Sequence, residues 1–311
     1  MAQENGVLRE GARRVWKRQR IVWWFFFVNF VLCWVATAPY SARLAGFTAH
    51  SLHSERLVNG FDYSVYSELV SNPEVGHDAR LPESGVAVLV YFVFALFLTG
   101  GVLETYAADR KLTTSEFFQA CGAFFWRWFR LLIVMSIIIV PVIMFSRFLF
   151  HKSGKMMLNT LNEKTGYWVG LLALLLSTFV MMVVRLWFDM AQVRTVVDDE
   201  RGMIRTALRA FKFTFSHFRS LFWLYFRISA LAWLGVAAGL WLWSRIPGQR
   251  SGLSFFVLEI MLLWWIGTRL WQRASETVWF LRYSVASLAT PPDPMQPQSP
   301  ATLIPGPALT D

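Results

Sequence analysis

The chain has 311 residues, of which 55% are hydrophobic, 17% aromatic and only 16% charged, and its formal charge is +10. Because a soluble globular protein carries about 25% charged residues, this composition excludes an ordinary soluble domain and favours a polytopic membrane protein with anionic lipid at one face. The basic residues adjoin apolar runs long enough to span lipid, which argues against nucleic-acid binding.

Six apolar segments approach the length of about 20 residues that a helix needs to cross a bilayer. They are residues 21–39, 85–103, 131–150, 166–184, 221–243 and 254–268. The sequence therefore predicts an all-α polytopic membrane protein with six transmembrane helices. The first segment could instead belong to a signal peptide, because Ala36, Thr37 and Ala38 resemble a cleavage site. Since Pro39 would follow the cut and the run exceeds the usual signal core, we expect a retained helix.

The distribution of Lys and Arg predicts the orientation of these helices. Residues 1–20, 104–130, 185–219 and 269–311 carry six, four, seven and three of them, twenty in all, whereas the three opposite loops carry nine. Because basic residues concentrate in cytoplasmic loops, we expect both termini inside the cell. The expected location is the bacterial plasma (inner) membrane, with multiple passes.

Three basic and aromatic stretches precede the odd-numbered spans. They are GARRVWKRQR at 11–20, CGAFFWRWFR at 121–130 and AFKFTFSHFR at 210–219. Around the third stretch, apolar residues such as Ile204 and Phe215 fall on one helical face and the cations on the other. This separation is typical of an interfacial helix with its rings in the acyl boundary and its cations at phosphate level. We therefore expect amphipathic in-plane helices over 8–20, 114–130 and 203–219.

The cations of these stretches are the candidate lipid-interface residues, and anionic headgroups at the cytoplasmic face are their expected partners. A membrane-protein partner is the second class that we consider. The candidate residues are Arg13, Lys17, Arg20, Arg130, Arg205, Arg209, Lys212 and Arg219.

Helix-start signals accompany two of the stretches. Thr113, Thr114, Ser115 and Glu116 match a capping box before the second stretch. Acidic residues at 198–200 precede the third stretch, where the helix dipole favours negative charge.

The even-numbered spans resemble one another where they end. The segments LETYA, FDMAQ and WQRAS place Glu104, Asp189 and Gln272 at one equivalent point. We therefore interpret the chain as three repeats, each made of an in-plane helix and two spans.

Residues 1–290 are expected to form one integral membrane domain. Its longest outer connection, 40–84, carries apolar residues every four positions from Leu57 to Leu69, which predicts short helices on the outer surface. The tail at 291–311 has seven prolines and almost no charge, and we expect it to be disordered.

Small residues are interpreted as packing residues. Cys33 and Cys121 lie in apolar or aromatic surroundings and provide neither a disulfide framework nor a metal pattern. The small residues of GVAAG at 235–239 allow close helix approach, within the chain or between two chains.

Motifs that carry enzyme chemistry are missing. No P-loop, dinucleotide-binding glycine pattern, HExxH, GxSxG or CxxC occurs. We therefore predict no catalytic residue, no cofactor and no metal site, and an enzyme is the less favoured class. His50, His53 and nearby Glu55 could bind a metal, but we interpret them as solvated loop residues.

Four charges in or near the spans are the candidate functional membrane charges, because ionisable residues there are functional-site hypotheses. Arg227 and Glu259 are the deepest, and Arg185 and Asp189 lie four residues apart at a helix end, where they can pair. At a rise of ~1.5 Å per residue, the first two differ in depth by roughly 10 Å. A water or a third residue is therefore expected between them. Because a proton relay usually needs more than one buried carboxylate and only Glu259 is found, a structural tie is favoured over a relay.

The repeated stretch-plus-span units and the segment VVDDERGMIRTALRAF at 196–211 resemble a group of bacterial six-span membrane proteins. They are similar to the membrane domain attached to some glycerophosphodiester phosphodiesterases. The resemblance covers about residues 8–290 and implies a six-helix membrane fold. It transfers no catalytic residue, because the soluble phosphodiesterase domain has no counterpart here.

Three classes of function fit these observations. A non-enzymatic scaffold or accessory subunit of a bacterial inner-membrane complex is favoured by the in-plane helices and the missing catalytic motifs. A transporter or channel that uses Arg227 and Glu259 is the alternative, although the spans lack the Gly/Pro-broken pairs typical of midplane binding sites. A lipid-modifying membrane enzyme is supported only by the resemblance.

Overall fold

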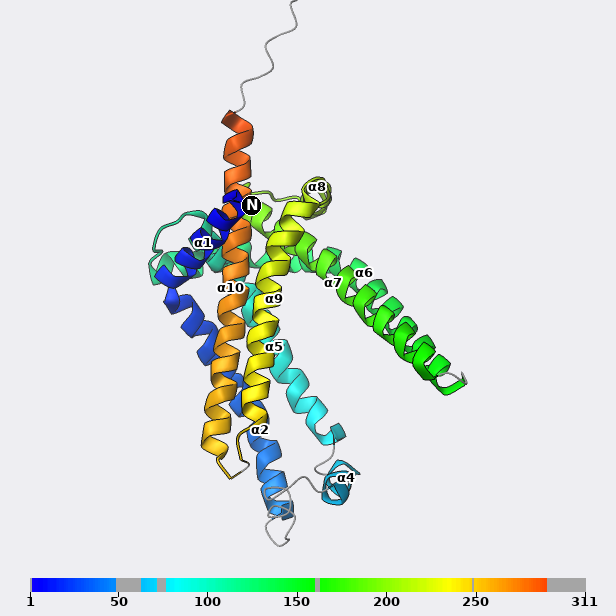
Figure 1. The fold of residues 1–311 in the computed structure, drawn as a ribbon. Helices are drawn as coiled ribbons and strands as arrows, with labels where there is room; N and C mark the ends of the chain where they lie inside the picture. Colours follow the sequence, from blue (N-terminus) through cyan, green and yellow to red (C-terminus); the bar gives the residue numbers. More distant parts are fainter. Residues whose placement is uncertain (1, 49–62, 72–76, 160–162, 248, 290–311) are drawn as a thin grey trace, which may run out of the picture.

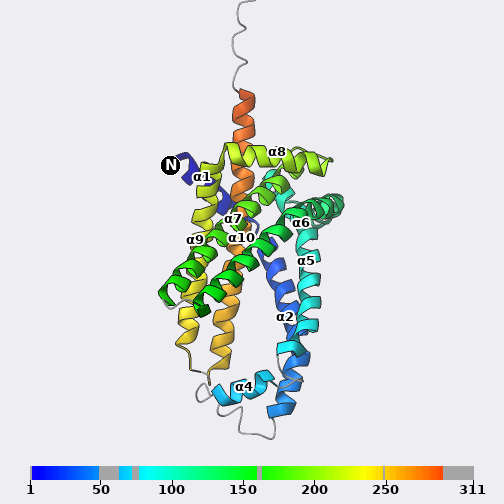
Figure 2. The ribbon, with the colours of Figure 1, turned by 90° about the vertical axis from the view of Figure 1, so that its right-hand side faces the viewer.

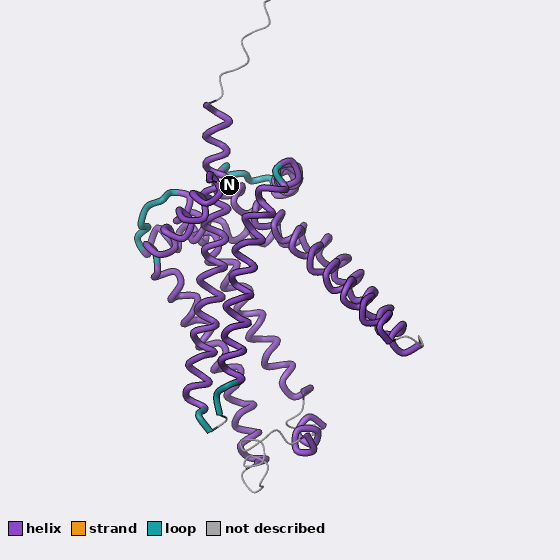
Figure 3. The backbone as a smooth tube through the Cα atoms, viewed as in Figure 1, coloured by secondary structure: helices purple, strands orange, loops and turns teal. Residues whose placement is uncertain are grey.

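The computed structural model describes residues 2–48, 63–71, 77–159, 163–247 and 249–289, and within them all regular structure is helical (Figures 1 and 3). The elements are α1 (Ala2–Lys17), α2 (Gln19–Thr48), α4 (Tyr63–Ser71), α5 (His77–Ala107), α6 (Thr114–Asn159), α7 (Glu163–Val197), α8 (Met203–Ser216), α9 (Phe218–Ser244) and α10 (Ser251–Ala289). Six of these helices are long and apolar enough to cross a membrane: α2, α5, α6, α7, α9 and α10. The protein is a multi-pass membrane protein, as the sequence predicts.

The α1 and α8 helices lie at one end of the molecule, which we call the α1/α8 face. The N-terminal end of α1 and the C-terminal end of α10 lie at this face, whereas α4 and the α9–α10 turn lie at the opposite end (Figures 1 and 2). In Figure 2, α8 runs across the vertical direction of α9 and α10. This arrangement is that of a short helix lying beside the ends of the spans.

The last helix is much longer than its apolar segment. Whereas the sequence pattern ends near Thr268, α10 continues to Ala289. Residues 272–278 include the buried polar side chains of Gln272 and Glu276. The hydropathy pattern stops early because polar residues interrupt it, although the helical backbone and the burial continue.

The α10 helix is the central element of the fold. It packs against α1, α2, α5, α7 and α9. In Figure 1 it runs alongside α9, while α1 lies across it near the α1/α8 face. Every other span except α6 therefore depends on α10 for part of its contacts.

The hydrophobic core is concentrated toward the α1/α8 face. Its largest fully buried side chains include Trp128, Phe117, Leu103 and Met190, all near helix ends on that side. Away from it, α6 and α7 pack on each other and diverge from the other spans (Figure 1). The most apolar stretches of α6 and α7 are 11% and 17% buried within the protein, the same shares as those of α2 and α10.

Two of the three expected in-plane helices are separate elements, and one is not. Turns at Arg18 and His217 separate α1 from α2 and α8 from α9. Residues 114–130, in contrast, are the first part of the unbroken helix α6. No proline lies among them to remove a helical hydrogen bond, and the capping box closes only the start of the helix.

The outer connections are partly helical. The α4 helix confirms a short helix in the first connection, and its Val65 is buried. Because α2 continues to Thr48 and α5 begins at His77, this connection is shorter than the predicted 40–84. Leu57, the rest of 49–62 and the tail at 291–311 lie outside the described residues.

Close helix contacts depend on small residues. A Cβ atom on Gly101 of α5 would lie 2.8 Å from the Phe117 carbonyl oxygen and 2.7 Å from Cys121 Sγ of α6. A Cβ atom on Gly235 would lie 2.0 Å from Trp264 Nε1, so the GVAAG segment packs within the chain. Cys121 is buried as expected, but Cys33 is exposed because it lies on the outer part of α2, where few side chains are buried.

The contact of α1 with α10 gives the first testable prediction. Gly11→Ala would place a methyl carbon 2.2 Å from Ser275 Oγ and 2.9 Å from Ser275 Cα. Overpacking of this kind costs about 1–3 kcal/mol, so the thermal midpoint of the purified protein in detergent is expected to fall. Gly122→Ala is the control, since nothing lies within 4 Å of its Cβ position. Equal midpoints for the two variants would contradict the α1–α10 packing.

Candidate functional site

A set of polar side chains meets where α5, α7, α9 and α10 pack, and we call it the buried polar cluster because its carboxylates are buried, although Arg185 is exposed and Arg269 and Arg273 are half-buried. Its members are Thr99, Arg185, Asp189, Tyr225, Arg269, Gln272, Arg273 and Glu276. Glu276 has no exposed surface, and Asp189 retains only 5% of its own. Two carboxylates at this depth require partners within the protein, because burying an unpaired charge is costly.

Hydrogen bonds connect the members on α10 and link them to α5. Arg269 Nη1 donates to Gln272 Oε1, and Gln272 Nε2 donates to Glu276 Oε1, both at 2.9 Å. Arg273 Nη1 donates to Thr99 Oγ1 of α5, also at 2.9 Å. These bonds fix the rotamers of the α10 side chains and the register of α10 against α5.

The second carboxylate reaches the cluster from α7. Arg185 Nε lies 4.0 Å from Asp189 Oδ2, which confirms the predicted i, i+4 pair. The carboxylates of Asp189 and Glu276 interact electrostatically with each other and with the guanidinium groups of Arg185 and Arg273. Since Glu276 Oε2 has no hydrogen-bond partner, the cluster retains one free acceptor in a region rich in guanidinium donors.

The sequence interpretation missed Glu276 and Arg273. Both follow the predicted end of the last span, so they were assigned to a cytoplasmic segment. The available signal was the spacing of Gln272 and Glu276, four residues apart between small or apolar residues such as Ala274 and Val278. This pattern indicates a continued helix with one buried polar row.

Arg227 and Glu259 are not brought together. Arg227 Nη1 donates to Asn5 Oδ1 of α1 at 3.2 Å, and its guanidinium lies 5.2 Å from the centre of the Trp223 ring. Glu259 is half-buried, its Oε2 has no hydrogen-bond partner, and no ion pair joins it to Arg227. No hydrogen bond or ion pair therefore joins Arg227 directly to Glu259 in the described part of the chain, and a tie through an intermediate group stays a prediction.

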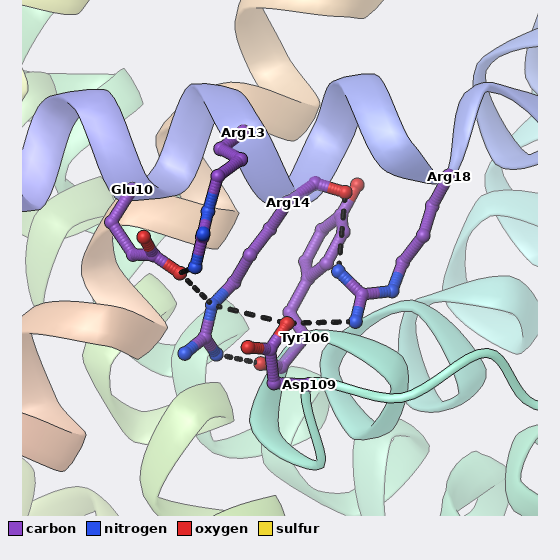
Figure 4. A network of polar contacts seen from close by, with 6 residues as sticks. All are labelled: Glu10, Arg13, Arg14, Arg18, Tyr106 and Asp109. Carbon is purple, nitrogen blue, oxygen red and sulfur yellow. Dashed lines mark hydrogen bonds and ion pairs between the residues drawn. The ribbon is translucent and has the colours of Figure 1, made fainter.

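A second polar network joins α1 to the end of α5 (Figure 4). Arg18 Nη2 donates to Asp109 Oδ1 at 2.9 Å, and Arg14 donates to the carbonyl oxygen of Tyr106. Glu10 pairs with Arg13 at 2.8 Å and with Arg14 at 3.4 Å. The Arg18 side chain is only 6% exposed, so α1 buries a cation to hold the loop after α5.

The loop after α7 repeats this arrangement. Asp109 and Asp199 have φ values of 47° and 46°, and each follows the end of its helix by two residues. Aspartate tolerates this left-handed conformation better than most residues. Asp199 pairs with Arg127 of α6, as Asp109 pairs with Arg18. Each aspartate thus ties the loop after an even-numbered span to the basic stretch that precedes the odd-numbered span of the same unit.

The two aspartates offer a second way to align the end of α5 with the end of α7. Counting back ten residues from Asp109 and Asp199 gives Thr99 and Asp189, and both of these contribute to the buried polar cluster. Glu104, which the sequence comparison set beside Asp189, is half-buried and lies five residues away from the matching position. The aspartate positions thus set Thr99 level with Asp189, whereas the sequence comparison sets Glu104 beside Asp189.

The predicted helix-start signals are present. Glu116 N donates to Thr113 Oγ1 at 3.2 Å and Thr113 N donates to Glu116 Oε2 at 2.7 Å, a reciprocal capping box. Near the start of α8, Glu200 accepts a hydrogen bond from Thr206 Oγ1 at 2.5 Å and pairs with Arg209 at 2.7 Å. These carboxylates hold the starts of α6 and α8.

The predicted lipid-interface cations are on the surface. Exposed residues are Arg13, Lys17, Arg20, Arg130, Arg205, Arg209, Lys212 and Arg219. On α8, Ile204, Leu208, Phe211 and Phe215 are also exposed. The α8 helix therefore buries one face, from Met203 to Thr214, and presents both an apolar stripe and a cationic row outward.

The side of α1 that contacts the protein carries small and apolar residues. Val7, Gly11 and Arg18 are buried, whereas Trp16 is 76% exposed. Gly11 permits close contact of α1 with α10. Arg18, in the turn after α1, reaches Asp109.

A metal site is not found among the described residues, where no three His, Cys, Asp or Glu side chains cluster suitably. His50 and His53, considered from the sequence, lie outside these residues.

The Asp109–Arg18 pair gives a prediction that depends on pH. The hydrogen bond from Arg18 holds the pKa of Asp109 below its ordinary value. A carboxylate whose pKa is lowered by folding stabilises the protein above its unfolded pKa, and this contribution is lost as the pH falls through the folded pKa. Asp109→Asn, which still accepts a positive φ, is expected to lower the thermal midpoint at pH 7 and to approach the parent below about pH 4.

Glu104→Gln is the matched control for this measurement, because no ion pair joins Glu104 to a described residue. It is expected to show no such pH-dependent difference. A constant difference between Asp109→Asn and the parent from pH 7 to pH 3 would contradict the ionic contribution.

The comparisons with known proteins identify no relative. No protein-family model matches the chain, and no curated protein and no solved structure is significantly similar to it. The candidate site is therefore defined by its geometry alone.

Proposed function

We propose that the protein is a non-enzymatic scaffold or accessory subunit of a bacterial inner-membrane complex. The observation that carries this proposal is the α6–α7 hairpin. Toward the α1/α8 face, α6 packs on α5 and α7 packs on α8, but farther along the two helices pack on each other and diverge from the other spans (Figure 1). Such an arm offers a long apolar surface inside the membrane to another membrane protein.

The surface of this arm is extensive. Exposed side chains on α6 include Ile137 and Met144, and those on α7 include Leu172 and Leu175. In lipid, helices associate through close van der Waals packing and polar contacts. The hydrophobic effect contributes little, because lipid tails are as apolar as the side chains. The outer part of this arm packs little against the other spans, which is consistent with a helix pair that packs against a partner.

Transport is the less supported function. The pair Arg227 and Glu259 on which it depended is not formed, because Arg227 binds α1. The polar side chains that do meet are joined to one another near the α1/α8 face, where they connect helices. These contacts support a role of the cluster in holding the helices together.

The resemblance to the membrane domain of some glycerophosphodiester phosphodiesterases is retained as part of this proposal. It concerns the architecture of six spans with basic stretches, and we infer no phosphodiester chemistry from it. The interpretation as three repeats is supported by the two matching aspartate–arginine pairs.

The proposal includes both termini on the cytoplasmic side, because the α1/α8 face carries most of the exposed cations. Reporter fusions after residues 158 and 248 are expected to report the outside, and those after residues 112, 200 and 290 the inside. Periplasmic activity of the fusion after residue 200 would reverse the orientation.

The scaffold function predicts a stable complex that depends on α7. Leu172→Ala with Leu175→Ala is expected to release a partner, since the two exposed side chains lie three residues apart on one face. Leu231→Ala with Leu234→Ala on α9 has the same spacing and serves as the control. Stoichiometric co-purification and native electrophoresis of the tagged full chain in mild detergent provide the measurement.

Two outcomes would contradict this function. The chain could migrate alone in native membranes, or the α7 and α9 variants could behave alike. A solute flux that disappears in Glu259→Gln while the chain stays monomeric would establish transport instead.

A further inference from the structure

A cavity of about 380 Å³ lies at the elbow between α1 and α2, and we call it the elbow cavity. Residues 16–21 of the elbow form one wall. Thr105 at the end of α5, Lys111 and Leu112 in the following loop, and Phe117 of α6 form the other. The cavity therefore lies between the basic stretch of the first unit and the start of the second.

The lining is strongly positive. It contains the cations of Lys17, Arg18, Arg20 and Lys111, and no carboxylate. Arg18 is neutralised by Asp109 at 2.9 Å. No ion pair joins the other three cations to any residue that the structure describes. Three uncompensated positive charges around one cavity favour an anionic ligand.

One of these cations is held in place by neutral groups. Arg20 Nη2 donates to the Leu112 carbonyl oxygen at 3.1 Å, and Nη1 lies 3.5 Å from Thr114 Oγ1. The Arg20 guanidinium also lies 4.9 Å from the centre of the Trp24 ring. These contacts orient the guanidinium without cancelling its charge, which is the arrangement suited to a phosphate oxygen.

The remaining lining is apolar and places the cavity at the depth of the membrane interface. Ile21 and Phe117 are buried beside it, whereas Trp16 is exposed. The membrane span of α2 begins at Gln19, immediately beside the cations. Tryptophan side chains and cations of this kind gather at headgroup level. A ligand with a phosphate group above an apolar body fits this lining.

We propose that the elbow cavity binds a phosphate-bearing anion, with Lys17, Arg20 and Lys111 contacting the phosphate. A phospholipid headgroup and a free phosphate share this chemistry. The apolar floor and the interfacial depth favour the headgroup. The site is a discrete one, distinct from the diffuse attraction of exposed cations to an anionic leaflet, and it does not depend on the scaffold function.

Native mass spectrometry of the delipidated full chain in detergent tests this site. The probes are phosphatidylglycerol, phosphatidylcholine and inorganic phosphate, each titrated separately. Phosphatidylglycerol is expected to bind the parent at one tight site. Lys17→Gln with Lys111→Gln is expected to weaken this binding roughly 10-fold or more, which corresponds to about 1.4 kcal/mol.

The control removes the same charge elsewhere. Arg205→Gln with Lys212→Gln changes two exposed cations of α8 that lie outside the elbow cavity, and it is expected to leave binding unchanged. The charge-retaining variant Lys17→Arg with Lys111→Arg is expected to restore most of the affinity. Unchanged thermal midpoints in all variants show that the fold is retained.

The outcomes separate the two sources of phosphate. Tight binding of phosphatidylglycerol, with little effect of millimolar inorganic phosphate, assigns the site to a lipid headgroup. A thermal shift with inorganic phosphate alone, lost in the Lys17 and Lys111 variant, assigns it to a free phosphate. Equal weakening of binding in the elbow and α8 variants would overturn the proposal. A parent chain that binds neither phosphatidylglycerol nor inorganic phosphate would also overturn it.

Discussion

The α10 helix carries charges into the interior, and side chains of the helices around it supply most of their partners. Glu276 is fully enclosed, one helical turn after Gln272, and neither can reach water. Arg273 is drawn to Thr99 of α5, and Asp189 of α7 joins the same group. Since removing one member of a buried charge network strands the others, the cluster constrains α5, α7 and α10 together. The close contact of Gly11 with Ser275 then adds α1 to this assembly.

Two aspartate–arginine pairs stabilise the loops at the α1/α8 face. After α5 and again after α7, the chain leaves the helix through an aspartate with positive φ. Asp109 binds Arg18 in the turn before α2, and Asp199 binds Arg127 in the first part of α6. The α10 helix continues to Ala289, the last residue that the structure describes. The loops after α5 and α7 therefore share one arrangement, an aspartate with positive φ that pairs with an arginine.

The sequence predicted the elements whose signals are local. Apolar length located the six spans, the capping box located the start of α6, and face separation located α8. It did not predict which polar residues are buried, because Glu276 and Arg18 look like ordinary charges until their partners on other helices are known. Depth alone suggested Arg227 and Glu259 as a pair. The rotation of each helix about its own axis determines which side chains meet, and depth along the helix does not give those rotations.

The concentration of the core at the α1/α8 face has a consequence for how the protein meets bilayers of different thickness. The outer parts of α6 and α7 are held mainly by each other, so this pair can change its tilt with little cost to the buried contacts. A helix longer than the local hydrocarbon layer accommodates mismatch by tilting, at fractions of a kcal/mol per ångström. The arm is therefore the part of the chain that adapts to membrane thickness, while α1, α8 and the end of α10 keep one geometry.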